Sequence, residues 1–256
     1  MADIEKKLSL NELFDLMNFD LSRLYVDRSG SECLEYDFDI QPSEFIKHAE
    51  FDIQQNSNHG LVNGLSNAKR AIDCQVDSVL GCFGLLSRRN FPQKMEVLSK
   101  MGMIAPRIVS KVVKARNYLE HEFKQPEREQ VEDAVDIATL FCTSLDKELR
   151  NFHSGFYIGT VVDGVYDEGE LFHDKWIDIA FDSQEIIFEI SGLIFDEVPT
   201  PVSRKAHHIK SAIIKPQEQG YIDLLKLAFS LNKPITKSEI VQQATLFIQT
   251  FSTATT

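Results

Sequence analysis

The chain has 256 residues, enough for one large or two modest domains, with the 43% apolar content of ordinary globular proteins. Its apolar runs are short and broken by charge, and its first residues lack the basic start and apolar run of a secretory signal, so the sequence argues against a membrane span or secretion. The four cysteines are scattered without a Cys-x-x-Cys pair, which favours buried free thiols in the reducing cytoplasm over a disulfide framework or zinc knuckle: Cys33, Cys74, Cys82 and Cys142. We therefore expect a cytoplasmic protein that needs no metal or other cofactor.

The formal net charge of -12 disfavours nonspecific nucleic-acid binding by the chain as a whole. Residues 61–124, however, contain 11 basic and 5 acidic side chains, so this segment carries +6 and the remainder -18. A basic segment in an acidic chain fits a nucleic-acid footprint. It fits equally well an internal contact in which acidic flanks neutralise the basic part.

The N-terminal region shows mixed signals. Ser9-Leu-Asn-Glu12 is a capping-box sequence and predicts a short helix that runs to about Asn18. Residues 21–26 and 33–40 have strand-like apolar patterns around Arg28-Ser-Gly30, which predicts two strands joined by a turn. Residues 1–41 are thus expected to form an α/β extension.

Residues 42–150 have a helical pattern throughout. Apolar residues recur at three- and four-residue spacing, and prolines or polar breaks separate the repeats. The predicted helices cover residues 42–53, 61–83, 92–103, 106–123 and 127–149. This segment is therefore predicted to be a bundle of about five helices.

After Asn151 the apolar period changes. Strands are predicted at residues 156–162, 175–181 and 185–190, with a hairpin connection at 182–184, and helices return at 218–232 and 238–251. Residues 163–170 are expected to be an acidic loop, His207-His208 a loop pair, and Trp176 a core or sheet-edge residue. The predicted fold class is mainly α: the bundle of residues 42–150 with an added α+β region formed by residues 1–41 and 151–256.

The predicted helix 106–123 carries the strongest functional signal. On a helical wheel His121 points away from the apolar stripe, Asn117 and Lys114 share that side, and Arg116 lies on the flank. An arginine can hold a phosphate and a histidine can transfer protons near neutral pH, so Arg116 and His121 can cleave RNA without a metal. Two copies of the helix facing across a two-fold axis would bring both groups into one groove, which predicts a homodimer.

A simpler interpretation stays open. Arg116 and Glu120 are four residues apart and can form a surface ion pair, and His121 can be an exposed histidine near a helix end. An arginine and a histidine at this spacing also arise by chance.

The segment Ala115-Arg-Asn-Tyr-Leu-Glu-His-Glu-Phe123, followed by Pro126 and an acidic amphipathic helix, resembles the HEPN superfamily. The upstream segment 67–77 resembles the long helix of the first pair in these proteins, and the resemblance covers roughly residues 42–150. Members are all-α bundles, and many are metal-independent ribonucleases with an Arg-x(4–6)-His motif and a polar residue after the arginine. The resemblance implies that Arg116 and His121 are catalytic with Asn117 as helper.

The resemblance also implies a role in toxin–antitoxin or antiviral defence, cleavage that leaves a 2′,3′-cyclic phosphate, and an antitoxin or other regulatory partner protein. Lys111, Lys114, Arg88 and Arg89 are candidates for contact with the RNA backbone, although for the Arg88-Arg89 loop plain solvent exposure is the simpler interpretation. Two alternatives stay open: a non-catalytic HEPN-like dimerisation or nucleotide-binding module of a larger complex, and an interaction protein whose acidic face docks a basic partner.

Overall fold

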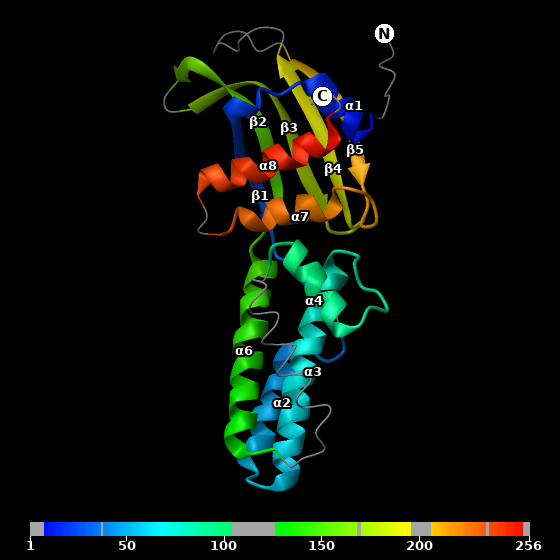
Figure 1. Cartoon of the computed structure of the whole chain (residues 1–256), viewed down its shortest axis with the longest axis vertical. Helices are drawn as coiled ribbons and strands as arrows, with labels where there is room; N and C mark the ends of the chain where they lie inside the picture. Colours follow the sequence, from blue (N-terminus) through cyan, green and yellow to red (C-terminus); the bar gives the residue numbers. More distant parts are fainter. Residues whose placement is uncertain are drawn as a thin grey trace. The chain divides into compact units, whose positions relative to one another are not determined.

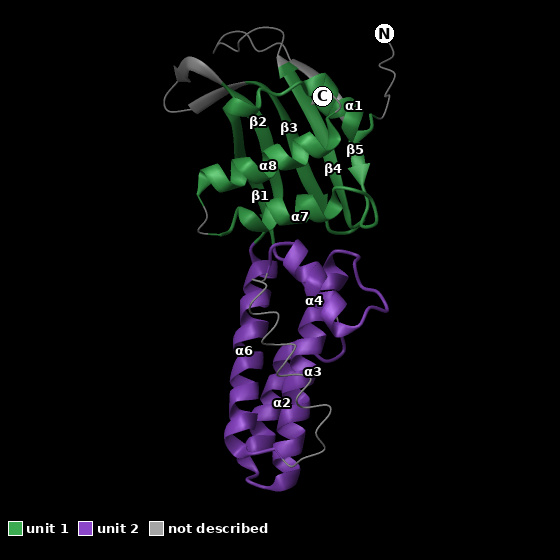
Figure 2. Ribbon diagram, viewed as in Figure 1, with its two compact units in different colours: residues 1–32, 152–256 green, residues 33–151 purple. Residues whose placement is uncertain are grey.

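A strand near the N-terminus pairs with the C-terminal half of the chain, so the two flanks build one unit and the middle builds another. The computed structural model describes residues 8–36, 38–103, 126–167, 170–195, 206–233 and 236–252. Unit 1 comprises residues 1–32 and 152–256, and unit 2 comprises residues 33–151 (Figures 1 and 2). The described residues form seven α-helices and a five-stranded antiparallel sheet, a mixed α/β fold.

The sheet of unit 1 follows the order of the chain. Its strands, each antiparallel to the next, are β1 (Leu24–Glu32), β2 (Phe152–Asp167), β3 (Glu170–Asp182), β4 (Ile187–Phe195) and β5 (Ala206–Ile214). Along β1 to β3, alternate residues such as Val26, Ile158 and Ile177 are opposite one another and buried. This period of two gives the sheet one apolar face, which packs against helices.

Three helices cover that face: α1 (Leu10–Met17), α7 (Tyr221–Ser230) and α8 (Lys237–Phe251), with the 3₁₀ turn Leu21–Arg23 leading into β1 (Figure 1). The capping box predicted at Ser9 forms and begins α1, and a second capping box, at Thr236, begins α8. Aromatic side chains fill the space between the layers. Phe14 meets Phe247 edge-on at 5.6 Å between centroids, and Phe188 meets Tyr221 at 5.4 Å.

Unit 2 contains α2 (Pro42–Gln54), α3 (Asn58–Cys82), α4 (Phe91–Lys100) and α6 (Arg128–Arg150). Helices α2 and α6 both pack on α3. All three helices come together at Gly64, where an added Cβ would lie 3.1 Å from Ile53 and 3.3 Å from Val131. All four helices lie where the sequence predicts them, with ends that differ by at most about three residues.

Several local predictions are wrong. Residues 21–40 do not form a hairpin; β1 runs through Arg28-Ser-Gly30 with register shifts and takes β2 as its partner instead. Two acidic-loop residues, Asp167 and Glu170, are paired across the β2–β3 hairpin. The histidines at positions 207 and 208 lie in β5, opposite Ile194 and Leu193, rather than in a loop. Each error arises because strand pairing depends on partners that are distant or weakly patterned in the sequence.

Two further predictions about side chains need correction. Cys33 is exposed and Cys74 only half-buried, so only Cys82 and Cys142 are buried thiols. Trp176 is neither core nor at the sheet edge; it is half-buried on β3, between β2 and β4. Within the described ranges, no helix is both long and apolar enough to cross a lipid bilayer.

Candidate functional site

The predicted catalytic residues Arg116, Asn117 and His121 lie outside the described residues, as do Lys111 and Lys114. Their roles and their mutual geometry stay predictions from the sequence. The other two predicted RNA contacts, Arg88 and Arg89, are described. They lie in the loop between α3 and α4, as the sequence indicates, and both are exposed to solvent.

This loop is anchored at both ends. Phe83 is fully buried and Gly84 adopts a left-handed conformation with φ 64°, which ends α3. At the other end the Asn90 side chain accepts a hydrogen bond from the Gln93 backbone N–H at 3.0 Å and begins α4. The backbone at both ends of the loop that carries Arg88 and Arg89 is therefore held in place.

Helix α4 is itself fixed to α3. Met95 and Leu98 are fully buried, and the Lys94 ammonium lies 2.6 Å from the Asp77 carboxylate. Lys94 is thus neutralised within the fold. Arg88 and Arg89, in contrast, are exposed to solvent.

Unit 2 contains a cavity of about 570 Å³ that no motif indicated. Its walls come from the segment before α2, the middle of α3 and the last turns of α6. The polar residues that line it include Glu35, Tyr36, Gln41, Asp146 and Arg150. All of these belong to the part of the chain that the structure describes.

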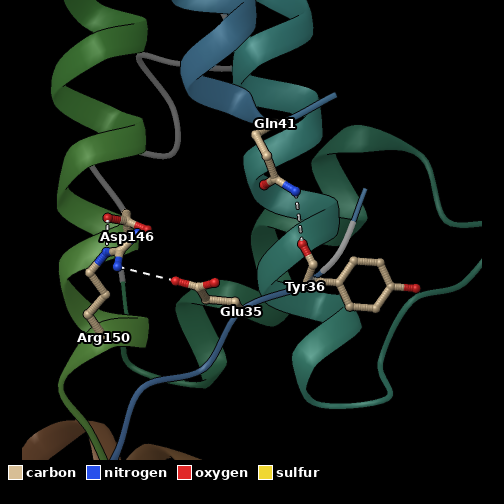
Figure 3. Close-up of polar contacts among 5 residues, drawn as sticks. All are labelled: Glu35, Tyr36, Gln41, Asp146 and Arg150. Carbon is tan, nitrogen blue, oxygen red and sulfur yellow. Dashed lines mark hydrogen bonds and ion pairs between the residues drawn. The ribbon is translucent and has the colours of Figure 1, made fainter. Parts of the chain in front are cut away.

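One guanidinium links two carboxylates at the edge of this cavity. Arg150 Nε lies 2.7 Å from Asp146 Oδ2, one helical turn earlier, and Arg150 Nη1 lies 3.2 Å from Glu35 Oε1 (Figure 3). The hydrogen bond to Asp146 and the charges of Asp146 and Glu35 raise the pKa of Arg150. The three side chains together carry one net negative charge, which suits a neutral or cationic group better than a phosphate.

Gln41 shapes the opposite wall. Its side-chain amide donates to the Phe38 carbonyl at 2.9 Å and to the Tyr36 carbonyl at 3.4 Å (Figure 3). Its backbone N–H in turn donates to Glu44 at 2.9 Å, as part of the capping box that begins α2. The segment before α2 is thereby folded into a defined loop.

The buried polar residues that line the cavity include no activated nucleophile. Gln75 and Ser78 are buried, and the Ser78 hydroxyl donates to the Cys74 carbonyl at 2.9 Å. Burial raises the pKa of Cys142 to about 12, and the thiol donates to the Ala71 carbonyl at 3.5 Å. A protonated thiol is a poor nucleophile, so this cavity has the character of a binding site rather than of a thiol-dependent active site.

A second, more open polar cleft of about 390 Å³ lies between α2 and α3. The Asn67 side chain donates to Asp52 at 2.9 Å and accepts from Arg70 at 3.3 Å, and exposed His48 completes the rim. Asp52 offsets the charge of Arg70. The cleft therefore contains hydrogen-bonding groups but has little net charge.

Part of this geometry could have been anticipated. The spacing of Asp146 and Arg150 is that of a helical ion pair, and the pair is visible in the sequence. The recruitment of Glu35 and the Asp52–Asn67 bond join segments that no local pattern connects. Over the described residues there is also no cluster of three or more His, Cys, Asp or Glu side chains placed to hold a metal ion.

Comparison of the chain with protein-family models, with curated proteins and with solved structures finds no match.

Proposed function

We propose that the chain is a metal-independent endoribonuclease of HEPN type that acts as a toxin or in antiviral defence. The observation that carries the proposal is the Arg116-Asn117-x3-His121 spacing within the basic segment 61–124. Its place in the chain, between the described helices α4 and α6 of a helical unit, supports the proposal.

The chemistry needs few groups. The ribose 2′-hydroxyl attacks the adjacent phosphorus, and a histidine takes its proton as general base. Arg116 stabilises the negative charge that develops on the phosphorane, and a histidine, His121 or its counterpart in a second copy, protonates the leaving 5′-oxygen. The products carry a 2′,3′-cyclic phosphate and a 5′-hydroxyl.

The surroundings of the undescribed segment support the proposal. The chain enters it after α4, which is tied to α3 by Lys94 and Asp77, and leaves it before α6, where Arg128 donates to Asn56 at 2.9 Å. Asn56 precedes α3 and Asp77 lies near its end, so these ties are roughly 30 Å apart at the rise of an α-helix. The helix expected at 106–123 would be about 26 Å long, which is enough to span most of the distance between these two contacts along α3.

Exposed Arg88 and Arg89 extend the proposed RNA contact beyond the catalytic pair. A phosphate backbone is bound chiefly by accessible arginine and lysine side chains. The loop that carries them is anchored on α3 and α4, and α4 leads into the segment with the motif. We include both residues in the proposed RNA-binding surface.

A cleavage assay tests the proposal. The purified protein is incubated with RNA in EDTA beside Arg116→Ala and His121→Ala, with Arg28→Ala and His59→Ala as matched controls at exposed positions. We expect cleavage to survive chelation, to leave cyclic phosphate ends, and to fall about 100-fold or more in the first two variants only. Cleavage that requires a divalent ion, or that persists in both motif variants, contradicts the proposal. Nucleotide binding without cleavage favours a non-catalytic module instead.

A further inference from the structure

The sheet of unit 1 has a second face, opposite the one covered by α1, α7 and α8, and its side chains are of two kinds. Aromatic rings of Tyr25, Tyr157 and Trp176 are half-buried there, and exposed or half-buried carboxylates lie among them. The acidic residues on this face are Asp27, Asp178 and Glu189.

The strand register places these groups in rows across the sheet. Asp27 on β1 is opposite Tyr157 on β2, and Tyr157 is opposite Asp178 on β3. A carboxylate therefore flanks the Tyr157 ring on each side. The two aspartates are two strands apart, about 10 Å, with the Tyr157 residue between them, so a planar cation over that ring would lie near both carboxylates.

The neighbouring row is aromatic. Tyr25 on β1 and Trp176 on β3 are both opposite Gly159 on β2. Because Gly159 has no side chain, no group from β2 separates the two rings in this row. The Tyr25 and Tyr157 rings are also close, with centroids 6.2 Å apart. The rings and carboxylates form one continuous surface over β1 to β3, which we call the aromatic–acidic face and define by Tyr25, Asp27, Tyr157, Trp176 and Asp178.

One lysine of the chain already makes a cation–π contact with a ring of this face. Lys237 Nζ, from the first turn of α8, lies 5.3 Å from the centroid of the Tyr25 ring. The hydroxyl of the same tyrosine donates to Asp27 at 2.9 Å. The combination of a ring face and a nearby carboxylate thus attracts a positive group at the edge of the sheet.

We propose that the aromatic–acidic face binds an arginine-bearing basic segment of another protein, with one guanidinium over the Tyr157 ring between Asp27 and Asp178. Arginine is the cation that both stacks on aromatic rings and pairs with carboxylates through its planar fork. The aromatic–acidic face has a ring and two carboxylates in adjacent positions, with Asp178 exposed and Asp27 and Tyr157 half-buried. The site is separate from the proposed ribonuclease motif, so either proposal can fail without the other.

The charge of the face excludes the other obvious occupants. Aromatic residues on an open sheet can stack on nucleobases, but Asp27 and Asp178, with Glu189 on the next strand, repel the phosphates that accompany the bases. Face-to-face docking of two copies is also disfavoured, because Asp27 and Asp178 would then meet carboxylates of the same sign. A basic protein segment satisfies both the rings and the charge.

Trp176 is the only tryptophan of the chain, so its emission reports directly on this face. The experiment titrates the full-length protein with a synthetic Gly/Ser peptide that carries four spaced arginines, and with the same peptide in which citrulline replaces arginine. The test variant is Asp27→Asn with Asp178→Asn, which keeps side-chain size and an acceptor oxygen. The matched control is Glu185→Gln with Asp223→Asn, which removes two exposed charges elsewhere in unit 1.

We expect the arginine peptide to change the tryptophan emission and to bind about tenfold more weakly to the test variant, while the control variant binds like the wild type. Affinity should fall as salt rises, and the citrulline peptide should not bind. Tyr157→Phe should retain binding and Tyr157→Leu should lose it, since the ring and not the hydroxyl holds the cation; circular dichroism confirms that each variant is folded. Equal binding to both double variants, equal binding of the citrulline peptide, or tighter binding of an RNA oligonucleotide at the same face overturns the proposal.

Discussion

The ring of Tyr36 lies directly against the α-carbon of Gly81, near the end of α3. A Cβ added at Gly81 would lie 2.5 Å from Tyr36 Cδ2 and 2.8 Å from Cζ, distances that real side chains do not adopt. The same ring meets Phe38 at 4.7 Å between centroids. This contact, with the Gln41 amide on the Tyr36 carbonyl, fixes the segment that enters unit 2 onto its longest helix.

Gly81→Ala should therefore destabilise unit 2 although alanine is the better helix former. The helix gains up to about 1 kcal/mol from the substitution, whereas forcing the ring away costs about 1–3 kcal/mol. We expect a net loss of about 1 kcal/mol or more in the free energy of unfolding, measured by urea denaturation followed by circular dichroism. Ser66→Ala, at an exposed position of the same helix, is the control and should be close to neutral. If Gly81→Ala is more stable than the wild type, the contact with Tyr36 is not tight.

The four cysteines should react with a thiol reagent in an order set by burial. Cys33 is exposed and should react first, and Cys74, half-buried with a pKa raised mainly by burial, should follow. Cys82 and Cys142 have pKa values raised to about 12 by burial, so at pH 8 only about one molecule in ten thousand carries either thiolate. Mass mapping after brief alkylation measures the order. Modification of Cys142 before Cys33 in the native protein would be inconsistent with the structure.

The two buried thiols also predict how stability depends on pH. Below about pH 9, the ordinary pKa of 9.0, both the folded and the unfolded state keep these protons and the thiols add no pH dependence. Between pH 9 and about 12 the unfolded state loses them while the folded state keeps them. The free energy of unfolding should then fall by up to about 1.4 kcal/mol per pH unit for each thiol.

Urea denaturation at pH 8 and pH 10.5 measures this loss. Cys142→Ala removes one of the two titrating thiols and should flatten the decline, whereas Cys33→Ala, at an exposed site, should not. An identical decline in wild type and Cys142→Ala would show that the thiol does not titrate differently on unfolding.

Local signals in the sequence predict most of the helices. The capping residues Ser9 and Thr236 and the long apolar stripe of α3 specify elements through contacts three or four residues away. Strand pairing is different, because β1 ends up beside β2, more than a hundred residues later, and β5 lacks a strong alternating pattern. The sequence suggested a local hairpin for residues 21–40 because a nearby partner is the simplest one to propose.

The candidate sites divide in the same way. The Arg116–His121 spacing and the exposed Arg88-Arg89 loop are visible in the sequence because they lie within short segments. The Glu35–Arg150 pair and the Asp27–Tyr157–Asp178 row exist only once distant strands and helices are aligned. The sequence therefore indicated a reactive motif but not the cavity of unit 2 or the aromatic–acidic face of unit 1.

Removal of the charges of Arg88 and Arg89 should weaken RNA binding without altering the chemical step. Each arginine that contacts a phosphate contributes about one unit to the slope of log affinity against log salt, so Arg88→Gln with Arg89→Gln should lower that slope by up to about two. Fluorescence anisotropy with a labelled RNA measures it. Arg28→Gln with Lys226→Gln removes two exposed charges from unit 1 and is the matched control. An unchanged slope in the test variant would remove the α3–α4 loop from the proposed RNA surface.

Unit 2 should fold by itself when residues 33–151 are excised. The Leu34 N–H donates to the Leu149 carbonyl at 3.0 Å, so the segment enters and leaves the unit at neighbouring points and removing the flanks strains neither end. The excised fragment should show helical circular dichroism and one cooperative thermal transition. A fragment that ends at residue 151 but keeps residues 1–32 should aggregate more readily. In that fragment β1 lacks β2, its neighbour in the described sheet, and exposes Leu24 and Val26, which are buried in the intact sheet. Light scattering compares the two fragments. Aggregation of the shorter fragment, with the longer one monomeric and cooperative, would mean that unit 2 depends on residues of unit 1 for its stability.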